Sequence, residues 1–244
     1  HRLFPGGSLK IVAGKAPRNL RRHTCRILLI DEADAIEVSA EGDPITLAER
    51  RTMSFANRKI ICGSTPLEEA TSHVGRLYGQ SDQRIWEMPC PSCKAFAELT
   101  WSAIEWPVGQ PERAAWRCPH CQELIPERNK PRMLSRGRWR ALRPEVEGHA
   151  GFRINALASL LPAAAWGKLA AEYERAKQDE ATLRVFVNTV LGDPWREPAD
   201  EVDEASLAGR GEPFDLDHLP AEVLAITMGI DTQDDRFEIT ATGH

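Results

Sequence analysis

The sequence has no long apolar run and no leader-like beginning. Nowhere in its 244 residues do about 18 consecutive apolar residues occur, the length that a membrane-spanning helix needs. The first residues also lack the basic-then-apolar layout of a secretory signal peptide. We therefore expect a soluble protein that is not exported, with the cytoplasm as its default compartment and no membrane partner.

Positive charge is scarce. The 31 lysines and arginines are outnumbered by 36 aspartates and glutamates, so the formal net charge is −5. A protein that coats nucleic acid through its overall field would carry the opposite sign, so any contact with DNA has to use a local basic surface. One candidate for such a surface is the stretch around Trp139. A solvated strand face would explain its basic residues equally well. Its basic residues are Lys130, Arg132, Arg136, Arg138, Arg140 and Arg143.

Cysteine is rare and concentrated. Of the six cysteines, four stand in two Cys-Pro-x-Cys pairs separated by 24 residues, Cys90 with Cys93 and Cys118 with Cys121. Two such knuckles bring four thiolates to one tetrahedral zinc ion, and a closed shell of four sulfurs makes that zinc structural. His120 is expected to be a bystander. Two redox or disulfide pairs are the alternative, which the cytosolic composition disfavours.

Two short apolar runs predict a parallel α/β unit. Residues 26–30 and 59–62 are typical of strands, and the first is expected to be buried because its apolar run is continuous. Between them, Asp43 followed by a proline indicates a helix start, and the helix is expected over residues 44–55. A further strand is expected at residues 9–13. The order strand, helix, strand favours a parallel sheet.

Acidic and hydroxyl side chains follow these strands. Asp31 and Glu32 come directly after the first strand, and Ser64 and Thr65 follow the second. Nucleotide hydrolysis needs an aspartate at a strand tip to hold magnesium and a glutamate beside it to polarise the attacking water. A small hydroxyl-bearing turn on the next strand could sense the terminal phosphate. The alternative is an ordinary strand-to-loop junction.

A phosphate-binding loop is missing. The sequence contains no Gly-x-x-x-x-Gly-Lys-Ser/Thr motif, and Gly14-Lys15 is followed by Ala16. This chain is therefore not expected to hydrolyse ATP by itself. We expect such a loop to precede His1 in the complete protein.

The C-terminal half predicts two helices, a linker and a hairpin. Amphipathic helices are expected over residues 166–178 and 180–191. Residues 196–221 are acidic and rich in proline and glycine, which indicates a linker. Beyond it, residues 223–230 and 236–242 predict two strands of a hairpin.

Asp231 ends the first strand of that hairpin. Two-metal nucleases hold two divalent ions in a cluster of carboxylates, one of which commonly comes from the first strand of the sheet. Asp231 could supply such a ligand, whereas Asp234 and Asp235 are typical of a turn. One acid alone cannot form the site, so an ordinary strand end is the alternative.

Seven motifs follow one another along the chain. They are residues 28–34, 42–44 and 63–66, the two cysteine pairs, and residues 186–189 and 229–236. In this order the chain resembles the lambda-like family of large terminase subunits of tailed bacteriophages, and the resemblance spans essentially the whole sequence.

The resemblance implies an α/β fold. Part of a parallel-sheet P-loop-type ATPase domain would carry an inserted zinc ribbon and be followed by the first hairpin of a ribonuclease H-like nuclease domain. The implied division is residues 1–85 for the C-terminal part of the ATPase domain, 86–131 for the zinc-ribbon insertion, 132–195 for the helical remainder of the ATPase domain, 196–221 for the linker and 222–244 for the start of the nuclease domain.

The resemblance also implies an activity, ATP-driven translocation of DNA and endonucleolytic cutting of concatemers. ATP, magnesium and a structural zinc are the implied cofactors. Asp31 would be the magnesium-associated acid, Glu32 the hydrolytic base, Ser64 and Thr65 the coupling motif, and Asp231 the first nuclease metal ligand. The implied partners are double-stranded DNA, a small terminase subunit, a portal protein and further copies of the chain, in the cytoplasm of a bacterial host. The phosphate loop and the other nuclease carboxylates are expected outside this sequence.

Two other functions stay open. Residues 31–34 spell Asp-Glu-Ala-Asp, the box of one helicase group, so a helicase-type ATPase with a zinc ribbon is the first alternative. It should show a second motor domain after Arg136, where this chain instead offers two helices, a linker and a hairpin. The second alternative is a zinc-ribbon DNA-binding adaptor with a degenerate ATPase.

Overall fold

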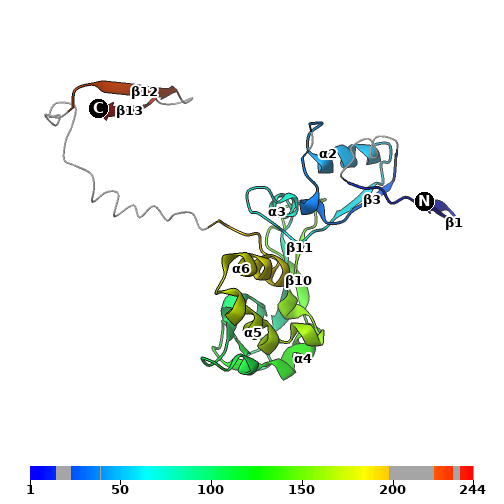
Figure 1. Cartoon of the computed structure of the whole chain (residues 1–244). Helices are drawn as coiled ribbons and strands as arrows, with labels where there is room; N and C mark the ends of the chain where they lie inside the picture. The colour runs from blue at the N-terminus through cyan, green and yellow to red at the C-terminus, as the bar shows by residue number, and fades with distance from the viewer. Residues whose placement is uncertain (15–22, 39, 198–222, 233–236, 244) are drawn as a thin grey trace. The chain divides into compact units, whose positions relative to one another are not determined.

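The chain folds into two units in a computed structural model, and each is described by itself. The first comprises His1–Arg196 and the second Glu197–His244 (Figure 1). The structure describes all residues except 15–22, 39, 198–222, 233–236 and 244. None of the helices in the described part of the chain is long and apolar enough to cross a membrane.

The N-terminal part of the first unit contains the predicted parallel strand pair. Strand β3 (Ile27–Ile30) pairs in parallel with β4 (Lys59–Cys62), with Ile27 opposite Lys59. Helix α2 (Pro44–Glu49) connects them, and the Asp43 carboxylate accepts the backbone N–H of Ile45 at 2.8 Å to begin that helix. A hairpin of β1 (Arg2–Phe4) and β2 (Gly7–Leu9) precedes the pair.

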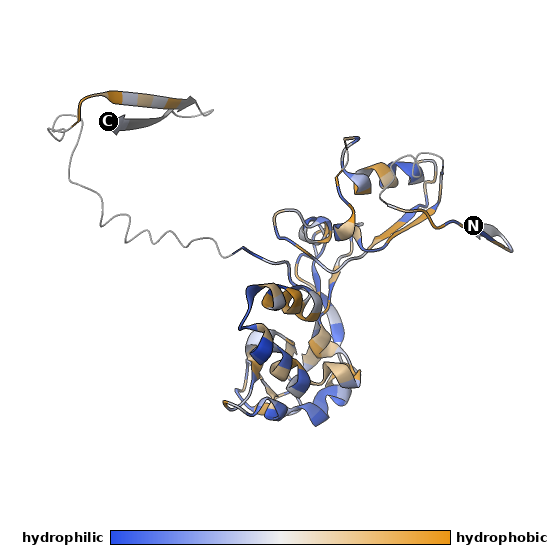
Figure 2. Cartoon of the chain, viewed as in Figure 1, coloured by the Kyte–Doolittle hydropathy of each residue, from blue (hydrophilic) through white to orange (hydrophobic). Residues whose placement is uncertain are grey.

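Three expectations for this region need correction. The strand expected at residues 9–13 ends at Leu9, because β2 is the second arm of a tight hairpin. The helix expected over 44–55 is α-helical only to Glu49 and continues as the 3-10 turn Arg50–Thr52. Strand β3, coloured hydrophobic in Figure 2, is not buried, since Leu29 is 63% exposed. Within the described residues its sheet has two strands, which leaves much of its surface uncovered.

The middle of the first unit is built around one central strand, β5 (Arg84–Pro89). It pairs antiparallel with β10 (Arg138–Ala141) and β6 (Phe96–Glu98), and parallel with β11 (Phe152–Arg153). A second antiparallel sheet holds β7 (Ile104–Glu105), β8 (Ala115–Arg117) and β9 (Leu124–Pro126).

Helices close this part of the unit. The α-helices are α3 (His73–Gly79), α4 (Lys130–Leu134), α5 (Trp166–Ala176) and α6 (Glu180–Phe186), and α6 runs into a π-helical turn, η8 (Val187–Leu191). The remaining 3-10 turns are η1 (Ala33–Ala35), η3 (Trp101–Ala103), η4 (Pro111–Arg113), η5 (Glu127–Asn129), η6 (Ala156–Ala158) and η7 (Pro162–Ala164).

One hydrophobic core unites the two sheets with α5 and α6. Met88, Trp116, Trp166 and Phe186 are all at most 1% exposed and belong to the same buried cluster. The predicted apolar stripes of both helices supply part of it, although α5 ends at Ala176 and the second helix changes to π geometry after Phe186. Gly192 stops the turn in the left-handed region, with φ of 66°, where glycine avoids the steric cost of a side chain.

The second unit contains the predicted hairpin. Strand β12 (Ile226–Thr232) pairs antiparallel with β13 (Phe237–Gly243), with Ile230 opposite Ile239. The expected turn residues 234 and 235 lie outside the described residues, as does nearly all of the linker expected over 196–221.

Candidate functional site

The carboxyl ends of β3 and β4 lie side by side. The backbone N–H of Gly63 donates to Ile30 O at 3.0 Å, and the N–H of Ala33 donates to Gly63 O at 3.2 Å. These bonds extend the parallel register past both strand ends. The acidic residues after β3 and the hydroxyl residues after β4 therefore meet at one edge, as the parallel pairing predicted.

Glu32 occupies an unusual backbone conformation at this edge. Its φ of 49° and ψ of 51° lie in the left-handed region, which residues other than glycine rarely adopt and where strained residues often belong to functional sites. Its carboxylate oxygen Oε2 lies 3.3 Å from Ser64 Oγ. The same hydroxyl lies 3.0 Å from Thr65 O, and its single proton can serve only one of these two acceptors at a time.

The carboxylates of Asp34 and Asp31 differ in their hydrogen bonding. The Asp34 carboxylate accepts the backbone N–H groups of Val74 at 2.9 Å and Leu67 at 3.0 Å, so both of its oxygens are used inside the fold. Its own N–H donates to Ser64 Oγ at 3.2 Å. Asp31 is exposed and makes no hydrogen bond with a described residue, which leaves its carboxylate open to an external ligand.

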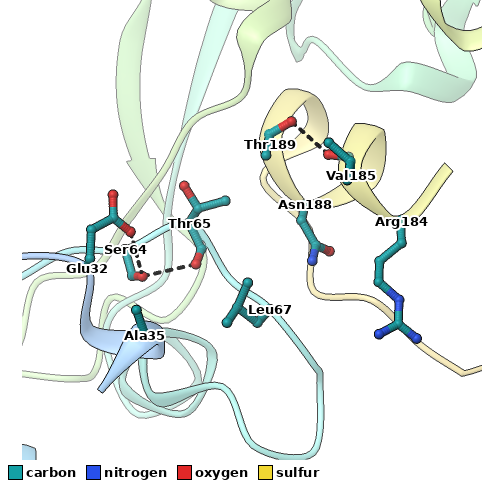
Figure 3. A pocket seen from close by; sticks show the side chains of 9 residues that line it. All are labelled: Glu32, Ala35, Ser64, Thr65, Leu67, Arg184, Val185, Asn188 and Thr189. Carbon is teal, nitrogen blue, oxygen red and sulfur yellow. Dashed lines mark hydrogen bonds between the residues drawn. The ribbon is translucent and has the colours of Figure 1, made fainter. Parts of the chain in front are cut away.

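A cavity of about 320 Å³ adjoins this edge. Figure 3 shows Glu32 and Ser64 on one wall and the end of α6 with its π-helical turn on the other. Its lining residues are Glu32, Ala35, Ser64, Thr65, Leu67, Arg184, Val185, Asn188 and Thr189.

Hydrogen bonds connect the two segments that supply the walls of the cavity. Arg184 Nη1 donates to Glu68 Oε1 at 2.6 Å, and the backbone N–H of Trp195 donates to Leu67 O at 2.6 Å. Glu69 N–H in turn donates to Trp195 O at 3.0 Å. The segment after Thr65 and the segment after α6 thus form one connected rim.

Asn188 is a cavity residue that the sequence did not assign to a site. It is 6% exposed, and its side-chain oxygen Oδ1 is buried without a hydrogen-bond partner. In the sequence it stood out only as part of the motif at residues 186–189 and as an asparagine within a largely apolar helical stretch. Its burial and its lack of a partner depend on the tertiary structure.

The four paired cysteines converge, as their spacing predicted. Their Sγ atoms all lie within 4.8 Å of one another, and both Cys90–Cys121 and Cys93–Cys118 are 3.8 Å apart. A tetrahedron of sulfurs about 2.3 Å from a central zinc has edges of about 3.8 Å. The donor set and its spacing therefore fit zinc.

Both cysteine knuckles have the same backbone geometry. In the first, Cys90 N–H donates to Ala95 O at 2.9 Å and Lys94 N–H donates to Cys90 O at 3.0 Å. The second repeats this, with Gln122 N–H donating to Cys118 O at 2.9 Å. Lys94 and Gln122, each directly after the second cysteine of its pair, have φ of 67° and 61°.

The individual thiols differ in their electrostatics. Burial raises the pKa of Cys118 to about 12. A hydrogen bond from the backbone of Glu123 lowers the pKa of the exposed Cys121. His120 is not a member of the cluster, and its Nε2 lies 3.1 Å from Phe96 O, which agrees with its expected role as a bystander.

The basic stretch around Trp139 is largely committed to pairing within the fold. Arg138 and Arg140 bind the two oxygens of Glu87 at 2.7 and 2.6 Å, and that carboxylate is 2% exposed. Lys130 is 3% exposed and donates to Ala164 O at 2.9 Å. Glu87 and Ala164 are distant in sequence, so this pairing could not be read from it. The interpretation of these residues as phosphate contacts, like the alternative of a solvated strand face, stays a prediction.

Asp231 lies in β12, opposite Glu238 in the register of the hairpin. The position at a strand end agrees with the prediction. Its side chain lies outside the described residues, so its role as a metal ligand stays a prediction.

Comparison with known proteins places the chain among phage proteins. The sequence model described as "Phage terminase large subunit gpA, ATPase domain" matches residues 1–139, and "Terminase large subunit gpA, endonuclease domain" matches residues 149–244. Relatives include "Terminase, large subunit" of Enterobacteria phage P21, 25% identical over 99% of this chain and 41% of the relative, and the protein of the same name from Escherichia phage lambda, 24% identical over 99% and 41%.

The chain thus spans about two fifths of the length of these relatives. No solved structure matches it significantly.

Proposed function

Because the chain belongs to the phage terminase large subunit gpA family, we propose that it is part of a DNA-packaging enzyme, one that drives DNA translocation with ATP and cuts concatemeric DNA. The observation that carries this proposal is the edge where Glu32 meets Ser64 at 3.3 Å beside the exposed Asp31. The activity is assigned to the complete large subunit, since this chain has no phosphate-loop motif.

In the proposed ATPase centre the two adjacent acids have separate tasks. Asp31 would hold the magnesium ion that accompanies the nucleotide, because an open carboxylate at a strand tip suits that ligand. Glu32 would take a proton from the attacking water as the water oxygen bonds to the terminal phosphorus and the bridging P–O bond breaks, leaving ADP and inorganic phosphate. The proton relayed through Glu32 is then released to solvent.

Ser64 and Thr65 would couple this chemistry to movement. The Ser64 hydroxyl has two acceptors in reach, Glu32 Oε2 at 3.3 Å and Thr65 O at 3.0 Å. A change at the Glu32 carboxylate would alter which acceptor the Ser64 hydroxyl serves. That change would be passed to the following loop and its Glu68, which binds Arg184 of α6. This makes the hydroxyl turn the natural coupling element.

The four-cysteine cluster would hold a structural zinc ion, with Cys90, Cys93, Cys118 and Cys121 as ligands. Four sulfurs leave no open coordination position, which excludes a catalytic role for that ion. Zinc would stabilise the charge that four thiolates accumulate in a cluster where two of the cysteines, Cys90 and Cys118, are fully buried.

The C-terminal hairpin would begin a ribonuclease H-like nuclease domain. Asp231, at the end of its first strand, would be one carboxylate ligand of a magnesium-dependent site that cuts the phosphodiester. We also propose that β3 and β4 belong to the sheet of a P-loop-type ATPase domain. The proposed domain boundaries follow residues 85, 131, 195 and 221, as given above.

The proposed partners follow from the family. They are double-stranded DNA, a small terminase subunit, a portal protein and further copies of the chain around the portal, all in the cytoplasm of a bacterial host. A helicase-type ATPase would differ by separating DNA strands, and a DNA-binding adaptor would show no ATP turnover even in the complete subunit.

The test uses a complete large subunit that contains this chain and is as long as its relatives. Glu32→Gln should abolish DNA-stimulated ATP turnover while leaving nucleotide binding intact, because the amide cannot accept the water proton. Glu37→Gln, a change of the same chemistry at an exposed position five residues after Glu32, should turn over ATP normally. Undiminished turnover by Glu32→Gln would overturn the assignment.

A further inference from the structure

Asn188 has a feature that the proposed function does not yet use. It is 6% exposed, lines the cavity opposite Glu32 and Ser64, and buries its Oδ1 without a partner. A buried acceptor without a donor destabilises the fold, so such groups in native proteins usually serve a bound molecule or a reaction. A leucine of similar size would fill the same space without that cost.

The local backbone supports a functional reading. Asn188 lies in the π-helical turn Val187–Leu191, and such widened turns frequently occur at functional sites. The turn is fixed on either side, by Arg184 bound to Glu68 and by Trp195 bound to Leu67. Asn188 is therefore held against the rim that begins at Ser64 and Thr65 (Figure 3).

The chemistry of the cavity indicates which molecule would satisfy this oxygen. Oδ1 needs a hydrogen-bond donor, while the Glu32 carboxylate on the opposite wall also only accepts. Hydrogen-bonded water molecules can donate to both of these acceptors. The cavity, at about 320 Å³, has room for several water molecules at about 30 Å³ each.

We propose that Asn188 is a positioning residue of the ATPase centre, whose Oδ1 anchors the ordered water from which Glu32 draws its attacking molecule. This rests on the proposed function. One O–H of the anchored water points to Asn188, and the water next to it gives its proton to Glu32 as its oxygen bonds to phosphorus. The bond to the bridging oxygen breaks and ADP leaves. Asn188 itself exchanges no proton.

The proposal and a packing role for Asn188 predict opposite effects of Asn188→Leu. In the 244-residue chain, this change should leave the melting temperature unchanged or raise it, because it removes an unpartnered buried acceptor. Asn129→Leu is the matched control. Asn129 Nδ2 donates to Pro126 O at 3.2 Å, so losing that amide should lower the melting temperature.

Kinetics in the full-length subunit complete the test. Asn188→Leu should lower kcat for ATP by on the order of ten- to hundredfold with little change in KM, since the water and not the nucleotide is misplaced. Asn188→Ser, which keeps a hydroxyl acceptor, should recover several-fold of that loss. Asn129→Leu should keep the parental kcat.

The outcomes distinguish the role of Asn188 from the proposed ATPase function on which it rests. Parental kcat in Asn188→Leu, with Glu32→Gln inactive, overturns the role of Asn188 and leaves the ATPase assignment standing. A melting temperature that falls as in Asn129→Leu, with no recovery by Asn188→Ser, also overturns it and makes Asn188 a packing residue. Full turnover by Glu32→Gln overturns both proposals together.

Discussion

Asp34 accepts the backbone N–H of Val74 at 2.9 Å, across 40 residues of sequence. Its second oxygen accepts the N–H of Leu67 at 3.0 Å. The last acid of the Asp-Glu-Ala-Asp box is therefore a structural tie between η1 and the start of α3. Only the first two acids of the box remain for nucleotide chemistry.

This tie predicts a loss of stability in Asp34→Ala. Removing both acceptors leaves the N–H groups of Val74 and Leu67 without their partner, which should cost about 1–2 kcal/mol of unfolding free energy. Asp31→Ala, at an exposed residue without such bonds, should stay within about 0.5 kcal/mol of the parent. Urea denaturation of the three proteins measures both. Equal stability of Asp34→Ala and the parent would refute the tie.

The cysteine cluster predicts one zinc ion per chain and its loss in Cys93→Ser. A serine hydroxyl is a poor fourth ligand, so elemental analysis should show reduced zinc, and the melting temperature should fall because zinc binding contributes to folding. Cys25→Ser is the control, because Cys25 lies outside the cluster. Retention of a full equivalent of zinc by Cys93→Ser would contradict the assignment.

The geometry around Glu32 was predictable from the sequence because it depends on local patterns. Two apolar runs, each followed by polar residues, pair in parallel only with their carboxyl ends at one edge. The same applies to the cysteine pairs, whose repeated knuckles fix the positions of the sulfurs locally. Asp43 likewise begins α2 through bonds to residues two and three positions away.

Features that depend on distant partners were not predictable. The arginines of β10 looked like a phosphate-binding strip, and only the fold places Glu87, 51 residues before Arg138, beneath them. The buried state expected for β3 failed for the same reason, since burial depends on what covers a strand and not on its own composition. Asn188 belongs to the motif at residues 186–189, but the sequence assigned it no site, because its burial without a partner depends on the fold.

The C-terminal hairpin predicts that Asp231→Ala separates the two proposed activities. In the full-length subunit this change should abolish DNA cleavage, because it removes one carboxylate from a metal site that depends on several. ATP turnover should persist, since β3 and β4 belong to the other unit. Asp234→Ala, at a residue that the sequence assigns to the turn, should still cut. Cleavage by Asp231→Ala would remove it from the site.

Glu87 predicts a pH-dependent contribution to stability. Burial alone raises the pKa of this carboxyl, but hydrogen bonds and charge from Arg140 and Arg138 outweigh it and hold the pKa below its ordinary value of 4.5. A group whose pKa is lower in the folded state stabilises the fold above its unfolded pKa and loses that effect as pH falls through the folded value. The ionised Glu87 therefore stabilises the protein at neutral pH.

Glu87→Gln should accordingly destabilise the chain at pH 7 by about 1–2 kcal/mol, a range that allows for the half-exposed state of both arginines. The difference from the parent should shrink as pH falls below 4.5, because the parental carboxyl then takes up a proton first in the unfolded state and, at still lower pH, also in the folded state. Glu145→Gln is the control, because that carboxylate is 65% exposed and pairs with Arg143 at 3.3 Å; it should change stability little at any pH. Urea titrations at pH 7 and at successive lower values measure this. A difference between Glu87→Gln and the parent that stays constant on acidification would mean that the charge of Glu87 contributes nothing and that only its shape matters.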